Sequence, residues 1–343
     1  MALSADENTI LDMFSYMRPS GSAAEAAFVD KFLTPLGFKR DDFSNLVLQI
    51  GDKPSILWSS HMDTVHYVSG TQTLDYRNGI LTLSKRAKKG ASSCLGGDDT
   101  AGVWLMTEMV KAGVEGLYII HHAEERGCIG SSNLVQHDAK FVDGIKAAIA
   151  FDRRGYEDVI THQSAGRTAS DAFARSLASI LGGKYRPDDS GTYTDTNEYA
   201  GLIPECTNIS VGYFNQHTRS ERQDVHFLLG LRDTLITADF STLAIKRDPQ
   251  SGPYDDYRGG FHSFSGSSRY RSSTSLSSGH TLEGLIKQYP DIVADILEAQ
   301  GWDVGHLKAE ISSYYGGLFD DRDDDDDTLS LNNHHRAPWS DAA

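Results

Sequence analysis

Short apolar runs alternate with amphipathic segments over the first 240 residues, and this alternation constrains the fold more than any other feature. Apolar runs of strand length lie at residues 45–50, 55–60, 116–122, 147–151 and 207–213. Apolar residues recur at helical spacing at 6–17, 100–112, 170–181 and 224–238. Strands that alternate with helices form sheets covered on both faces. The sequence therefore predicts an α/β fold, a three-layer α/β/α sandwich with a mostly parallel mixed sheet.

Two local motifs add turns and helix starts to this pattern. Ser22 and Glu25 stand three residues apart before an apolar segment, which is the spacing of a capping box and predicts a helix start. Asn78 and Gly79 lie inside residues 71–84 and predict a β-hairpin with a two-residue turn.

The composition changes after residue 245 of the 343. Residues 1–245 predict one compact domain, and residues 246–280, which are rich in Ser and Gly, predict a flexible linker. Helical periodicity returns at 281–315, where we expect a small helical appendage that docks a protein partner or another subunit, or simply packs. Residues 316–343 contain a run of aspartates and predict an acidic disordered tail.

The charge and the cysteines limit the classes of function. The net charge is −16, which argues against binding to nucleic acid or to an anionic membrane. The three cysteines, too few and too scattered for a disulfide framework, fit a reducing compartment. The N-terminus has no signal-peptide pattern, and no apolar stretch approaches the roughly 20 residues of a membrane span. We therefore expect a cytoplasmic protein.

Five polar clusters lie at the ends of the predicted elements. They are His61-Met62-Asp63, the segment 96–99 with Asp98 and Asp99, the pair Glu124-Glu125, then Asp152, and finally His217. Because an α/β sheet places its ligands at the carboxyl ends of its strands, we expect these clusters to converge.

The chemistry of these side chains favours a pair of metal ions. Two imidazoles and three carboxylates can hold two zinc ions if one carboxylate bridges them. A water between two zinc ions has a lowered pKa, and a remaining carboxylate can take its proton. Asp63, two residues after His61, is placed to accept the imidazole N–H and fix its tautomer.

The clusters also carry a family resemblance. The order HMD, GGDDTAG, EERG, FDRRG and NQHT resembles that of the co-catalytic zinc peptidases, which include peptidase T, the carboxypeptidase G2-like enzymes and the bacterial leucyl aminopeptidases. The resemblance implies that Asp98 bridges two zinc ions and that Glu124 is the general base. It also implies that His61 and Asp152 bind the first ion and that Glu125 and His217 bind the second.

Two features of the sequence narrow the class of enzyme that the resemblance implies. Only 65 residues separate Asp152 from His217, which leaves no room for the lid domain of the peptidase T-like enzymes and resembles the single-domain secreted aminopeptidases. In the family, Asp rather than Glu at the position of Asp152 tends to accompany aminopeptidases. The resemblance therefore favours an aminopeptidase.

Four further residues are weaker candidates for substrate contact: Asp99, Arg153, Tyr193 and Asp195. Asp99 either supports the centre or recognises an amine, and Arg153 either binds a substrate carboxylate or is surface charge. Three other histidines are interpreted as packing residues: His66, His121 and His122.

Together these observations predict a cytoplasmic di-zinc exopeptidase, an aminopeptidase that hydrolyses short peptides. Cobalt or manganese can replace zinc in such a ligand set. An N-acyl amino acid amidohydrolase or a carboxypeptidase is the alternative within hydrolases. A catalytically silent metal-binding scaffold with a partner-binding tail is the alternative from another class.

Overall fold

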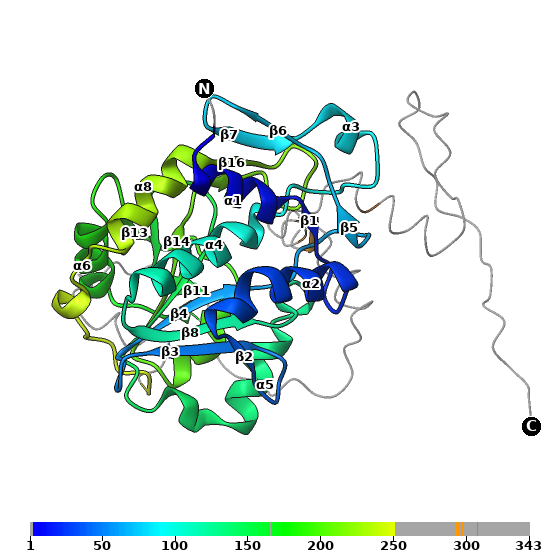
Figure 1. Ribbon diagram of the computed structural model, residues 1–343. Helices are drawn as coiled ribbons and strands as arrows, with labels where there is room; N and C mark the ends of the chain where they lie inside the picture. Colours follow the sequence, from blue (N-terminus) through cyan, green and yellow to red (C-terminus); the bar gives the residue numbers. More distant parts are fainter. Residues whose placement is uncertain (1–2, 165, 251–292, 295–296, 298–306, 308–343) are drawn as a thin grey trace, which may run out of the picture. The chain divides into compact units, whose positions relative to one another are not determined.

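The computed structural model describes residues 3–164 and 166–250, together with 293–294, 297 and 307 (Figure 1). The chain divides into two units, residues 1–269 and 270–343. Beyond residue 250, the predicted linker, helical appendage and acidic tail lie outside the described residues apart from these few positions, so their proposed roles stay predictions.

A mixed sheet of eight strands forms the centre of the first unit, in the order β13-β10-β14-β9-β4-β8-β3-β2. Its strands are β2 (Lys39–Arg40), β3 (Leu46–Ile50), β4 (Ile56–His61), β8 (Gly116–His121), β9 (Ala147–Arg153), β10 (Asp158–Ile160), β13 (Arg186–Asp188) and β14 (Glu205–Ser210). The four central strands β14, β9, β4 and β8 run parallel, while β10 and β3 pair antiparallel to their outer members. The predicted mixed, largely parallel sheet is confirmed.

Helices cover both faces of this sheet (Figure 1). One core contains apolar side chains from α1 (Ala5–Phe14), α2 (Ala23–Phe28), α4 (Gly97–Ala112), α6 (Asp171–Leu181) and α8 (Val225–Leu235). The second core contains Leu134 of α5 (Ile129–His137). Alternate residues of one strand enter different cores: Trp58 joins the first and Leu57 the second. This alternation makes the three layers.

Smaller elements complete the unit. A four-stranded sheet joins β15 (Tyr213–Phe214), β16 (Arg222–Asp224), β7 (Ile80–Leu83) and β6 (Leu74–Arg77), in that order. Two-stranded sheets pair β1 (Tyr16–Met17) with β5 (Gly70–Thr71), and β11 (His162–Gln163) with β12 (Gly166–Arg167). The short helices include a π-helix at Val29–Leu33, α3 (Lys85–Lys88) and α7 (Asp195–Glu198).

The local motifs behave largely as their sequences predict. Ser22 caps α2 by accepting the N–H of Glu25 at 3.2 Å. The hairpin turns at Asn78 and Gly79, whose φ angles of 51° and 82° suit a type I′ turn. The first helix, however, ends at Phe14 rather than at residue 17, because the next residues pair with β5.

The packed part of the first unit extends past the predicted boundary at residue 245. The backbone N–H groups of Lys246 and Arg247 donate to Glu205 Oε1 at 2.7 and 2.9 Å. The Arg247 guanidinium donates to the carbonyls of Ala200, Ile203 and Pro204. Residues 246–250 therefore belong to the packed unit. Among the described residues, no helix is long and apolar enough to cross a membrane.

Candidate metal centre

The five polar clusters meet at the carboxyl edge of the parallel strands. His61 is the last residue of β4, Asp152 lies near the end of β9, and Glu124 and Glu125 follow β8 after two residues. Asp98 lies in the first turn of α4. His217 comes from further away, in the loop between β15 and β16.

Asp98 stands between the two histidines. Its Oδ1 lies 2.9 Å from His61 Nε2, and its Oδ2 lies 3.1 Å from His217 Nε2. Each oxygen of one carboxylate therefore faces a different imidazole. This is the arrangement that a ligand shared by two ions requires.

Other carboxylates surround each imidazole. Asp152 Oδ1 lies 3.7 Å from His61 Nε2, and Glu125 Oε1 lies 3.2 Å from His217 Nε2. Glu124 Oε2 is 4.0 Å from His61 Nε2. The potential ligand atoms form three overlapping groups with all distances below 4.8 Å: His61 with Asp98 and Asp152, His61 with Glu124 and Glu125, and Asp98 with Glu125 and His217.

The excess of buried carboxylates in this cluster favours the binding of cations. Burial raises the pKa of Glu124 well above its usual range, and it also raises the pKa values of Glu125 and Asp152. Burial acts to lower the pKa of His61, but hydrogen bonds with the surrounding carboxylates outweigh it and the pKa lies well above its usual value. Four carboxylates crowd around two imidazoles, so divalent ions would balance their charge. Mixed imidazole and carboxylate ligands fit zinc.

Asp63 connects two parts of the centre. His61 Nδ1 lies 3.1 Å from the backbone oxygen of Asp63 and 3.5 Å from its Oδ1. The same Oδ1 accepts the backbone N–H of Glu124 at 3.1 Å. The carbonyl, rather than the predicted carboxylate, is thus the nearer partner of the imidazole, while the carboxylate orients the Glu124 segment.

Asp99 and Asp195 accept hydrogen bonds within the protein, which favours support of the centre over amine recognition for Asp99 and argues against the substrate contact predicted for Asp195. Their exposed fractions are 0% and 1%. Asp99 accepts hydrogen bonds from Ser60 Oγ and from the backbone N–H of His61. Asp195 accepts from Ser131 Oγ at 2.5 Å. Both carboxylates face the protein interior, which leaves no surface for a substrate.

Arg153 is likewise engaged within the protein. Its Nε donates to Asp158 Oδ2 at 3.0 Å, and its guanidinium lies 3.7 Å from Asp188. The structure therefore argues against the predicted contact with a substrate carboxylate. Tyr193 is 40% exposed, and its hydroxyl bonds to Glu198.

Two partners of Asp152 escaped the sequence analysis. Thr194 Oγ1 donates to Asp152 Oδ2 at 2.8 Å, and the Tyr213 hydroxyl donates to Oδ1 at 3.1 Å. Thr194 directly precedes Asp195, which was one of the weaker candidates for substrate contact. Tyr213 lies in the predicted strand 207–213, where an aromatic residue gives no sign that its hydroxyl serves a distant carboxylate.

Two of the three histidines interpreted as packing residues, His66 and His121, are buried in the protein. His66 is 3% exposed and lies 2.8 Å from Thr64 Oγ1, and burial lowers its pKa to about 4. His121 is fully buried against the Tyr199 hydroxyl. His122 is only partly buried.

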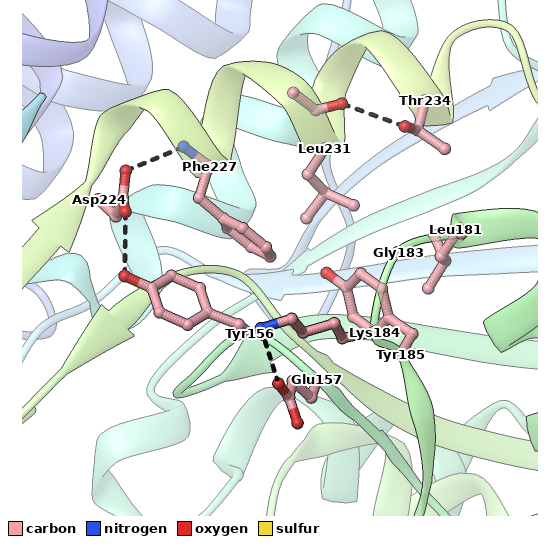
Figure 2. A pocket seen from close by; sticks show the side chains of 12 residues that line it. Tyr156, Glu157, Leu181, Gly183, Lys184, Tyr185, Asp224, Phe227, Leu231 and Thr234 are labelled. Atoms are coloured by element: carbon pink, nitrogen blue, oxygen red, sulfur yellow. Dashed lines mark hydrogen bonds and ion pairs between the residues drawn. The ribbon is translucent and has the colours of Figure 1, made fainter.

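A separate pocket of about 510 Å³ lies between α6, α8 and the start of β10 (Figure 2). None of the proposed metal ligands lines it. Its polar groups bond within the protein: the Tyr156 hydroxyl donates to Asp224 Oδ2 at 2.9 Å, and Lys184 lies 4.0 Å from Glu157. The pocket is therefore distinct from the metal centre.

Comparison with known proteins agrees with this geometry. Residues 45–201 match the profile of Peptidase family M28, a range that contains all the clusters except His217. This part of the chain is therefore similar to the peptidases of that family. The match supports a metallopeptidase. No curated protein sequence matches the chain.

Solved structures show the same fold. An aminopeptidase PepT from Bacillus cereus has a TM-score of 0.54 and 17% identity, over 67% of this chain and 96% of that one. A tripeptidase from Staphylococcus aureus has a TM-score of 0.52 and 17% identity, over 67% and 96%. The TET1 peptidase of Pyrococcus horikoshii has a TM-score of 0.51 and 15% identity, over 68% and 98%.

Proposed function

We propose that this protein is a di-zinc aminopeptidase that hydrolyses short peptides. The observation that carries the proposal is the position of Asp98, whose two oxygens lie 2.9 and 3.1 Å from different imidazoles. A carboxylate so placed, with further carboxylates behind each imidazole, has the geometry of a shared ligand.

The ligands divide into two sets around Asp98. His61 and Asp152 would hold one ion, and His217 and Glu125 the other. Bound zinc ions would polarise the scissile carbonyl and lower the pKa of water. The ligand chemistry also admits cobalt or manganese.

Glu124 is the proposed general base. Its side chain lies beside His61 without being needed as a ligand in either set, and burial raises its pKa. A carboxylate with a raised pKa takes a proton from the attacking water and holds it long enough to deliver it to the leaving amine. Asp63 keeps Glu124 in place through the Glu124 backbone N–H.

An aminopeptidase is favoured over a carboxypeptidase by the state of Arg153. That guanidinium was the candidate for binding a substrate carboxylate, and it is paired with Asp158 and Asp188 instead. The acidic centre suits the free ammonium group of a peptide N-terminus. We propose that Tyr193, exposed and next to the Thr194 that bonds Asp152, contacts the substrate. The cytoplasmic location stays a prediction.

Hydrolysis of matched substrates tests the proposal. The full-length protein, supplied in turn with zinc, cobalt and manganese, is assayed on leucyl-alanine, on its N-acetylated form and on N-acetyl-leucine. We expect cleavage of the free dipeptide and its loss after chelation. Preferred cleavage of either N-acetylated compound would favour the carboxypeptidase or amidohydrolase alternative. Metal binding without any hydrolysis would favour the scaffold.

A further inference from the structure

One buried carboxylate near the metal centre has a role that neither the sequence motifs nor the proposed mechanism includes. Glu221 is 0% exposed. Its Oε2 accepts the backbone N–H groups of Leu95 at 2.7 Å and Gly96 at 2.8 Å. Its Oε1 accepts those of Gly97 at 2.7 Å and Asp98 at 3.2 Å. One side chain thus satisfies four consecutive amides.

These amides are otherwise without partners of their own element. The first N–H groups of a helix have no intrahelical acceptor, and α4 begins here with Gly96 as its N-cap residue, which has no side chain to bond them. Glu221 takes that role from more than 120 residues away in the sequence. In its ionised form this carboxylate is also favourable to the helix dipole.

The fit around Glu221 is close. A Cβ added at Gly97 would lie 2.9 Å from Glu221 Oε1 and 3.1 Å from Tyr213 Cβ. A residue with a side chain at that position would therefore have to displace the carboxylate or the tyrosine. The segment before Asp98 can approach Glu221 only because it lacks a side chain there.

Glu221 also stands four residues after His217, in the segment that leads into β16. The backbone N–H of Glu221 donates to the backbone oxygen of Thr218 at 3.1 Å, and this hydrogen bond closes a turn between Thr218 and Glu221. The next residue, Arg222, pairs with Thr82 of β7 and anchors the segment in the small sheet. Residues 217–221 therefore carry His217 and, through Glu221, also bind the backbone N–H of Asp98.

We propose that Glu221 is a positioning residue that sets the Asp98 carboxylate against His217 and thereby fixes the affinity for the ion on the His217 side. The inference rests on the proposed metal centre. Glu221 touches neither ion nor substrate in this role. It acts by holding the segment that contains Asp98 and the segment that contains His217 in fixed positions relative to each other.

The test measures zinc binding rather than activity. Metal-free, full-length Glu221→Gln is titrated with zinc in competition with a chromophoric chelator. The amide keeps the shape of the side chain but turns an NH2 group toward two of the four backbone donors. We expect two zinc equivalents on the wild type, and on the variant one of the two steps weakened about 10- to 100-fold, as for other residues that orient metal ligands.

Glu205→Gln is the matched control. Glu205 is also 0% exposed and accepts backbone N–H groups, from Ser170 at 2.6 Å and Lys246 at 2.7 Å, but it lies at the opposite end of its strand from the metal edge. It should lose stability while keeping wild-type zinc affinity. An equal loss of affinity in both variants, or none in Glu221→Gln, would overturn the inference.

A second pair of variants covers a failure to fold. If Glu221→Gln does not fold, Glu221→Asp, which keeps the charge but shortens the reach, replaces it with Glu205→Asp as its control and the same criteria. A wild-type protein that binds no zinc would overturn the proposed metal centre together with the inference. A wild type that binds two equivalents and a Glu221→Gln variant that binds both with wild-type affinity would overturn the inference alone.

Discussion

At the scale of single residues, burial favours the neutral form of His66. His66 is 3% exposed, and burial lowers its pKa to about 4 from the ordinary value near 6.5. Between these pH values the unfolded chain binds a proton at this site that the folded protein does not. The contribution of His66 to stability is therefore complete above about pH 6.5 and is lost as the pH falls toward 4.

Replacing His66 by Gln should remove this dependence. We expect the stability difference between wild type and variant, measured by urea unfolding from pH 7.5 to 4.5 in the presence of chelator, to shrink by up to about 1.4 kcal/mol per pH unit below pH 6.5. His226→Gln, at an exposed position, controls for the exchange of side chains. Parallel curves for wild type and His66→Gln would contradict the lowered pKa.

The sequence indicated that the side chains of the proposed centre would converge, but it did not indicate which groups support them. His61, Asp98 and Glu124 could be found because parallel strands bring their carboxyl ends to one edge. Side-chain direction could not be predicted in the same way, which is why the sequence left open whether Asp99 supports the centre or recognises an amine, whereas in the structure it turns inward to Ser60. Glu221 was missed because its partners lie more than 120 residues away and are backbone amides, which leave no mark on the sequence.

At the scale of elements, the position of Asp98 depends on how closely α4 packs on β9. A Cβ at Gly102 would lie 2.5 Å from both the Phe151 backbone oxygen and Asp99 Oδ1. The absence of a side chain at this position lets the helix meet the strand directly. Gly102 is thus a glycine that the packing requires, inside a helix where glycine is otherwise unfavourable.

Gly102→Ala should therefore destabilise the protein, against the ordinary helix preference for alanine. Gly230→Ala is the control, because Gly230 lies inside α8 and a Cβ there would meet nothing within 4 Å. We expect the control to gain about 0.5–1 kcal/mol and Gly102→Ala to lose at least about 1 kcal/mol, by urea unfolding. A gain in stability in both variants would show that α4 does not contact β9 so closely.

The central strands were predictable because buried parallel strands are apolar throughout. The short strands β10 and β13, which end one side of the sheet, were missed, since three residues each are too few for a periodic pattern. Helix α5 was also missed, because Ser132 and Asn133 interrupt its apolar pattern.

At the scale of the whole molecule, the boundary of the catalytic unit is set by the contacts of residues 246–250. A chain that ends at residue 245 would lose the backbone donors of Lys246 and Arg247 and leave Glu205, which is 0% exposed, short of two partners. The composition change near residue 245 marks the end of the apolar pattern but not the end of these backbone contacts.

Truncation tests this boundary. We expect residues 1–250 to fold and to bind zinc as the full-length chain does. Residues 1–245 should be less stable than 1–250 by about 1–3 kcal/mol, because unpartnered buried acceptors are costly. Chemical unfolding of the two forms provides the comparison. Equal stability would place the boundary at 245, and failure of 1–250 to fold would show that later residues are required.

The proposed function depends most on Glu124, which is not needed as a ligand and should therefore be removable without loss of metal. The most direct measurement compares zinc-loaded wild type and Glu124→Gln for zinc content and for turnover of leucyl-alanine. We predict two zinc ions on each protein and a kcat lower by about 10²- to 10⁴-fold in the variant. Full turnover by a variant that retains its zinc would contradict the role of Glu124 as general base.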